Sequence, residues 1–274
     1  MFKLFLYELR SRRNAILGWG LGIGAYLAMI IAMSPDLAPQ FANLDLSAIP
    51  IYRAFGLTED FLSLSSLVSV YVSFLGMIIA VYGVIIGANA LAGEEDEGTL
   101  ENILTLPVSR VQIVLAKALA ISVALWLVLG IAFLGHAAAF PSVKADLEGE
   151  ISLWELFVST MESWPLALFF AMLALFMGAY LPRRSQAMGV GLTVLIGGYL
   201  FNNLAQQAGP LQDFRQYTPF YYNLGGKVLT EGLNWGYMAI LTGASLGLLG
   251  LAVLSFQRRD VTVGAWPWAR WQRP

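Results

Sequence analysis

Six apolar runs constrain this chain more than any other feature, because most of them approach or exceed the roughly 20 residues that a helix needs to cross a bilayer. They cover about residues 15–33, 67–91, 111–140, 164–181, 187–205 and 236–256, and the fourth is the shortest. With 58% hydrophobic and only 12% charged residues, the chain has too much apolar surface for one soluble core. We therefore expect an all-α polytopic membrane protein with six transmembrane helices, forming a single domain over residues 1–274.

The basic residues predict the orientation of these helices. If the amino terminus is cytoplasmic, only four of the 16 Lys and Arg residues lie outside: Arg53, Lys144, Arg215 and Lys227. Cytoplasmic segments of membrane proteins are enriched in Lys and Arg, so we expect both termini in the cytoplasm, in the cell (inner) membrane of a prokaryote.

Two segments outside the apolar runs have their own patterns. Residues 1–14 combine an apolar side with four basic residues, which predicts an interfacial elbow helix on the inner leaflet; a simple extension of the first span is the alternative. Residues 206–235 form a long, aromatic-rich external loop, part of which could re-enter the membrane. In the loop before the fourth span, residues 151–164 predict a separate surface helix.

The loop at residues 92–110 has the most distinctive local pattern. Four consecutive acids at 94–97 precede a short segment in which Leu100, Ile103 and Leu104 share one helical face. An amphipathic helix in an otherwise polar loop is typical of a surface that binds a partner.

The exit from this loop is also defined by sequence. Pro107 ends the short helix, and Ser109 and Gln112 have the spacing of a capping box, which predicts the start of the third long helix.

The ordered set of motifs resembles the cytoplasmic loop of type-2 permeases of ATP-binding-cassette (ABC) exporters. In that family an acidic segment ending in GTLE is followed by a P-[VT]-S-R turn and a later lysine; the matching positions here are 94–101, 107–110 and Lys117. The segment 218–232, the last apolar run and the FQRRD stretch at 256–260 also resemble the end of these permeases.

This resemblance implies a coupling helix that docks on a separate cytoplasmic ABC ATPase, which the elbow helix also touches. The positions that correspond to the ATPase contact are Glu97, Gly98, Thr99, Leu100, Glu101, Ile103, Leu104, Pro107, Ser109 and Arg110.

Polar residues inside the apolar runs suggest a substrate pathway. Uncharged amides and hydroxyls in a membrane need either a helix partner or a wet cavity, and both interpretations remain open here. The candidates are Tyr82, Asn89, Gly198, Asn202, Asn203 and Gln206. The second span also has small residues on one face, including Gly83 and Gly87, which favour helix packing, a dimer interface or a pathway lining.

Several classes of function are disfavoured by what the sequence lacks. One His and no Cys make a zinc site of the usual kind or a disulfide implausible, and no phosphate-binding loop of the GxxxxGK[ST] type is present. We therefore expect no enzyme activity and no cofactor in this chain, with ATP and Mg on the partner subunit. No Asp or Glu lies in the middle of a proposed span, which disfavours proton or sodium coupling.

The expected function is the permease subunit of an ABC exporter that moves a hydrophobic or amphipathic cargo, such as a drug, antibiotic, lipid-like molecule or peptide. Its expected partners are the ATPase, a second permease copy or a paralogue, and membrane lipid, with no nucleic acid. Sodium or polysaccharide export in the same superfamily, or a non-transporting sensor or assembly factor, remain alternatives.

Overall fold

Helices account for nearly all of the regular structure. The computed structural model describes residues 1–41, 64–100, 103, 105, 107–144, 151–181, 183–206 and 208–258, and these contain no strand. Six helical stretches are long and apolar enough to cross a membrane: Arg13–Leu37, Tyr71–Asp96, Arg110–Val143, Leu153–Tyr180, Arg184–Ala205 and Trp235–Arg258. The prediction of an all-α polytopic protein with six spans is confirmed.

The described elements are all helical. In chain order they are α1 (Phe2–Ser11), α2 (Arg13–Phe41), α4 (Leu64–Ala88), the π-helix η2 (Asn89–Gly93), α5 (Glu94–Asp96), α7 (Arg110–Val143), α8 (Leu153–Tyr180), α9 (Arg184–Ala205), the 3₁₀ helices η3 (Gly209–Tyr217), η4 (Pro219–Tyr222) and η5 (Gly225–Lys227), α10 (Val228–Glu231) and α11 (Trp235–Arg258).

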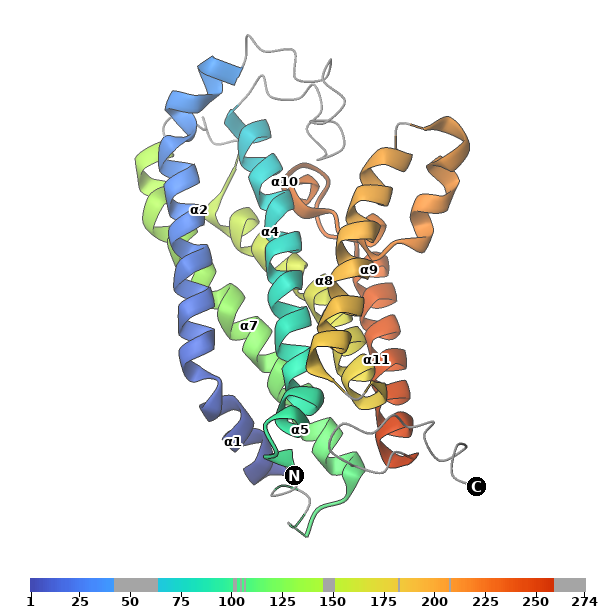
Figure 1. The fold of residues 1–274 in the computed structure, drawn as a ribbon. Helices are drawn as coiled ribbons and strands as arrows, with labels where there is room; N and C mark the ends of the chain where they lie inside the picture. Colours follow the sequence, from blue (N-terminus) through green and yellow to red (C-terminus); the bar gives the residue numbers. More distant parts are fainter. Residues whose placement is uncertain are drawn as a thin grey trace.

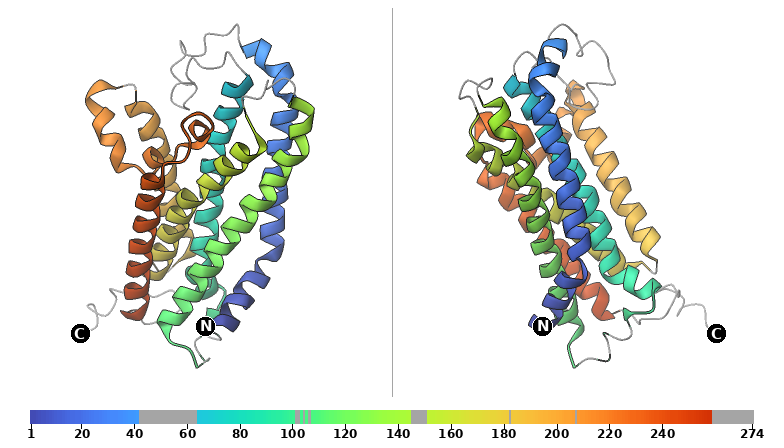
Figure 2. Two further views of the ribbon diagram at one scale, coloured as in Figure 1. Left: turned by 180° about the vertical axis from the view of Figure 1, so that it is seen from behind. Right: turned by 90° about the vertical axis from the view of Figure 1, so that its left-hand side faces the viewer.

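Helix α4 stands in the middle of the bundle, where it packs mainly against α8, while α2 pairs with α7 and α11 with α8 (Figure 1). The N-terminus, the turn after α4 and the end of α11 lie at one end of the bundle, which we call the α1 end (Figures 1 and 2). The opposite end, called the far end, has η3, η4 and α10. Helix α1 lies oblique to α2 (Figure 1).

The small residues of the second span pack inside this chain. A Cβ atom added to Gly83 would lie 2.5 Å from the carbonyl oxygen of Ala167, and one added to Gly87 would overlap the carbonyl of Ala171. The backbones of α4 and α8 therefore approach so closely that only glycine fits at these positions, which is the close packing that small faces allow in lipid.

Helix α8 differs from the sequence-based expectation. Residues 151–164 were expected to form a separate surface helix, but Ser152 caps one continuous helix that begins at Leu153 and runs through Pro165 to Tyr180. Proline removes only one backbone donor, and neighbouring helices in a membrane bundle tolerate that loss. One consequence is that Glu162 lies inside a span rather than in the external loop.

Candidate functional site

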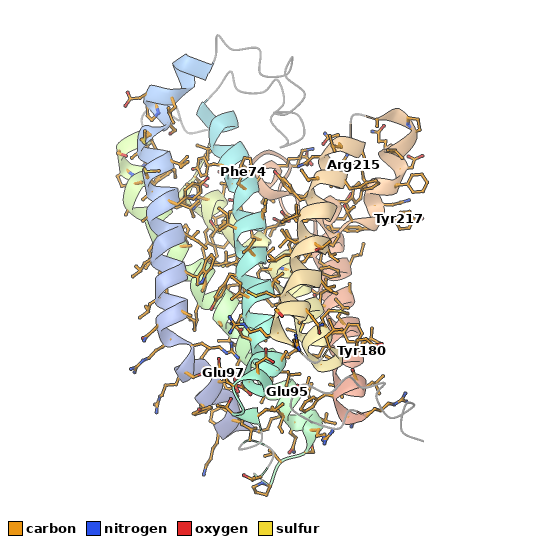
Figure 3. All side chains as sticks on the ribbon, in the orientation of Figure 1. Phe74, Glu95, Glu97, Tyr180, Arg215 and Tyr217 are labelled. Carbon is orange, nitrogen blue, oxygen red and sulfur yellow. The ribbon has the colours of Figure 1, made fainter. Side chains whose placement is uncertain are left out.

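The turn that follows α4 forms an exposed tip at the α1 end. Residues 96–99 are exposed, and Gly98 has a φ of +69°, a left-handed conformation that favours glycine. The tip is closed by Thr99, whose backbone N–H donates to the carbonyl oxygen of Glu94 at 2.8 Å. Figure 3 labels Glu95 and Glu97 beside α1 at this end.

A buried ion cluster fixes this tip to the rest of the bundle. The ammonium of Lys117, on α7, lies 2.5 Å from Oε1 of Glu8 on α1 and 2.6 Å from Oε1 of Glu94 on α5. Arg12 adds a second cation, 3.0 Å from Oε2 of Glu8. The side chain of Lys117 is fully buried, and its burial is tolerable because two carboxylates neutralise the two cations.

A second contact joins the acidic run to α9. The Oδ2 atom of Asp96 accepts a hydrogen bond from the backbone N–H of Arg184, the first residue of α9, at 3.0 Å. A carboxylate at this position satisfies one of the free donors at the helix start and is favoured by the helix dipole. Two residues of α5 therefore connect the acidic run to the bundle, Glu94 to α7 and Asp96 to α9, and Lys117 extends the connection to α1.

The apolar residues predicted to contact a partner are turned inward. Leu100 is completely buried in the core of this chain, so its side chain does not contribute to an exposed docking face. Ile103 is partly buried and packs against Leu4 and Ile113. The reason is that α1 and the start of α7 offer Ile103 an apolar surface that removes its side chain from water. Glu101 and Leu104 lie outside the described residues.

The remaining predicted contact residues are divided between the tip and the start of α7. Glu97, Gly98, Thr99 and Pro107 are exposed. The capping box is confirmed, since the backbone N–H of Gln112 donates to the Oγ of Ser109 and that of Ser109 to Oε1 of Gln112. The Arg110 guanidinium donates to the carbonyl oxygen of Phe256 at 3.1 Å, which ties α7 to α11.

Sequence reasoning missed Glu8 and Arg12 as partners of this cluster. Lys117 was noticed only as a motif residue, although a lysine seven residues into an apolar run signals a buried ion pair by itself. The two acids could not be assigned to it, since they come from elements 109 and 23 residues away in sequence.

The pathway candidates separate into two groups. Tyr82 lies in the part of α4 nearer the α1 end, and Asn89 is the first residue of η2. The hydroxyl of Tyr82 and Oδ1 of Asn89 are buried without a hydrogen-bond partner in the described structure. At the far end of α9, Oδ1 of Asn202 accepts from the hydroxyl of Thr218 at 3.2 Å.

The other far-end candidates have different surroundings. A Cβ at Gly198 would touch the ring of Phe220, Asn203 is buried, and Gln206 is exposed. The structure therefore does not bring the six predicted residues together at one place.

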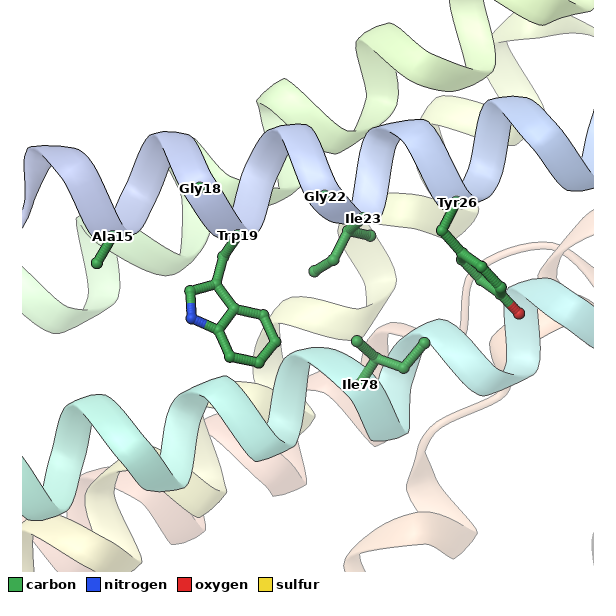
Figure 4. Close-up of a pocket in the computed structure, with 7 residues that line it drawn as sticks. All are labelled: Ala15, Gly18, Trp19, Gly22, Ile23, Tyr26 and Ile78. Atoms are coloured by element: carbon green, nitrogen blue, oxygen red, sulfur yellow. The ribbon is translucent and has the colours of Figure 1, made fainter.

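A cavity between α2 and α4 was not predicted. It has a volume of about 440 Å³ and is lined by Ala15, Gly18, Trp19, Gly22, Ile23, Tyr26 and Ile78 (Figure 4). The ring of Trp19 packs on that of Tyr82, with centroids 5.1 Å apart. No atom lies within 4 Å of a Cβ added at Gly18 or at Gly22, so both glycines face open space.

Comparison with known proteins gives one family. A family model described as an ABC-2 family transporter protein matches residues 4–261. No curated protein matches the chain.

Proposed function

The chain belongs to the ABC-2 transporter family, and we propose that it is the permease subunit of an exporter driven by a separate ABC ATPase. The family and the six apolar helices make it a multi-pass membrane protein and a permease component. Membership implies association with an ABC ATPase, and ATP hydrolysis on that subunit supplies the energy.

The observation that carries this proposal is the exposed tip at 96–99 and its rigid attachment to the bundle. Its backbone is closed by hydrogen bonds to Glu94, and Glu94 is bound by the buried ammonium of Lys117. Because the tip is fixed to the bundle in this way, a push from the ATPase would move the attached helices rather than only the tip. The proposed contact surface consists of Glu97, Gly98, Thr99 and Pro107, together with Glu101 and Leu104.

The proposed orientation places the α1 end in the cytoplasm of a prokaryotic cell. The excess of Lys and Arg in the segments at this end supports it. Helix α1 has Phe2, Leu6 and Tyr7 exposed, an amphipathic character that fits a helix lying at the inner leaflet.

In the proposed mechanism, closure of the ATPase dimer pushes on the tip and on α1. Lys117 connects both elements to α7, and Asp96 connects the tip to the first turn of α9. A displacement of the tip therefore acts on several membrane helices at once. The result is a shift of the equilibrium between an inward-open state and a closed or outward-open state.

The proposed cargo is hydrophobic or amphipathic. The cavity between α2 and α4 is lined by apolar, aromatic and glycine residues, and the ring of one of them, Trp19, packs on Tyr82, whose hydroxyl is buried. Six helices supply half of a pathway, so two copies, or one copy and a paralogue, would enclose the cargo. Asn89, in η2 directly after α4, adds a buried polar group closer to the α1 end than Tyr82.

Transport by inside-out membrane vesicles tests this proposal. We expect ATP-dependent uptake of a fluorescent amphipathic dye when the chain and its co-purifying ATPase are present. Glu97→Lys should weaken ATPase association by about tenfold or more, because it reverses a charge at the contact. Asp213→Lys, an exposed acid at the far end, is the matched control. Unchanged association and uptake in Glu97→Lys would exclude this contact surface.

A further inference from the structure

Glu162 is a buried acid that the proposed transport mechanism does not use. It lies nine residues, or about 13 Å, after the first residue of α8, and is 3% exposed. Its neighbours Thr160 and Ser163 are completely buried. A carboxylate in such a place is costly unless donors surround it, so its partners indicate why it is there.

The partners of Glu162 all belong to the turn between η4 and η5. Its Oε2 atom accepts from Nδ2 of Asn223 at 2.7 Å and from the backbone N–H of Gly225 at 3.2 Å. Its Oε1 atom accepts from the backbone N–H of Leu224 at 2.9 Å. One carboxylate from α8 therefore holds two consecutive backbone donors and a side-chain amide.

Ser73 of α4 accepts a hydrogen bond from the next backbone N–H of the same turn. The backbone N–H of Gly226 donates to the Oγ of Ser73 at 3.0 Å. A Cβ at Gly225, whose φ is +54°, would lie 2.8 Å from the Cα of Ser73, and one at Gly76 would lie 2.6 Å from Oδ1 of Asn223. The turn at residues 223–226 is thus packed closely against both helices.

The turn belongs to a segment that folds back over the far end of the bundle. Helix α10, which follows the turn, contacts α8 and lies at the far end in Figure 1. On the other side, the ring of Phe220 packs on Phe170 at 5.6 Å and on Tyr199 at 5.3 Å. The segment is therefore held by polar contacts at Glu162, Ser73 and Asn202 and by an aromatic contact centred on Phe220.

We propose that Glu162 is a positioning residue that holds the turn 223–226 closed against α4 and α8 until the far end opens for cargo release. The inference rests on the proposed function, because it takes the far end as the external exit. Hydrogen bonds suit a closure of this kind. They fix the turn while the end is closed, and water can replace them when it opens.

Thiol labelling in intact cells tests this inference, because the chain has no cysteine of its own. Val228→Cys places one thiol in α10, at a position that is 3% exposed. In ATP-depleted cells, a membrane-impermeant thiol reagent should label this cysteine slowly. Adding Glu162→Gln should raise the labelling rate by about tenfold or more, since losing a hydrogen bond to a buried charge shifts an equilibrium by that order.

Two further variants distinguish the loss of the Glu162 contacts from a general loss of folding. Glu155→Gln, on the first turn of the same helix, should leave the rate unchanged because glutamine can still complete the capping box. Ser73→Ala removes only the bond to Gly226 and should raise the rate less than Glu162→Gln does. Labelling as slow in Glu162→Gln and Ser73→Ala as in the parent would overturn the proposal.

Comparison of energised and ATP-depleted cells distinguishes this proposal from the proposed function. If the turn opens during transport, ATP should raise the labelling rate of Val228→Cys in the parent but change it little in Glu162→Gln. Fast labelling after Glu162→Gln, with no effect of ATP on Val228→Cys alone, would support the role of Glu162 in holding the turn. The same result would contradict opening of the turn driven by ATP.

Discussion

At the scale of single residues, Lys117 is the side chain that joins α1, α5 and α7 at the α1 end. It binds one acid from α1 and another from α5, and its own side chain is fully buried. The paired charges are tolerated together, whereas a single unpaired charge at this depth is strongly destabilising.

Replacing this lysine therefore has a predictable cost. Lys117→Met should destabilise the protein by about 3–5 kcal/mol, because Glu8 and Glu94 lose their shared cation. Adding Glu94→Gln to this variant should recover part of the loss, because Glu8 keeps its ion pair with Arg12 whereas Glu94 does not keep a cation. Thermal unfolding of the purified protein measures both changes, with the exposed Lys3→Met as control. Equal melting temperatures for Lys117→Met and Lys3→Met would contradict the assigned role.

Asn202 was a candidate for the cargo pathway, and its hydrogen bond with Thr218 now favours a structural role. We expect Asn202→Leu to lower stability by about 0.6–1.7 kcal/mol, the range measured for bonds between membrane helices. Export of two dissimilar compounds should keep the same ratio. A changed ratio with an unchanged melting temperature would return Asn202 to the pathway.

At the scale of elements, the capped start of α7 was predictable, whereas the full extent of α4 and α8 was not. The capping box at Ser109 was read directly from sequence, since a cap depends only on residues three positions apart. The continuation of α8 through Pro165 and of α4 into the π-helix η2 was not predicted. Both depend on tertiary partners, including the turn that binds Glu162, which local sequence does not reveal.

The contact between α4 and α8 gives a prediction for two glycines. Gly87→Ala should destabilise the protein by about 1–3 kcal/mol, because the added methyl group overlaps the backbone of Ala171. Gly22→Ala meets no atom within 4 Å and should leave stability unchanged or slightly higher. Denaturation midpoints of the two variants measure the difference, and similar values would show that the contact is less close than described.

At the scale of the whole molecule, hydropathy predicted the number of spans and the basic residues predicted an orientation. The pairing of α2 with α7 and of α4 with α8 was not predictable, because every span is apolar on most of its surface. The cavity beside α2 was missed for the same reason. Gly18 and Gly22 have the four-residue spacing typical of packing glycines, yet the helix arrangement shows that they face open space.

The proposed orientation predicts opposite labelling of the two ends. A cysteine at Thr99 should be protected from an impermeant thiol reagent in intact cells, whereas one at Gln212 should react. Both side chains are exposed, so accessibility within the protein does not determine the result. Labelling at Thr99 together with protection at Gln212 would reverse the orientation.

The central claim is that the exposed tip binds an ABC ATPase, and site-specific cross-linking tests it most directly. A photoactivatable cross-linker on Thr99→Cys in native membranes should capture a subunit that contains a GxxxxGK[ST] phosphate-binding loop, identified by mass spectrometry. The same reagent on Gln212→Cys should not capture it. Absence of this adduct from Thr99→Cys, in membranes where the ATPase still co-purifies with the chain, would contradict the assignment of the tip as the coupling site.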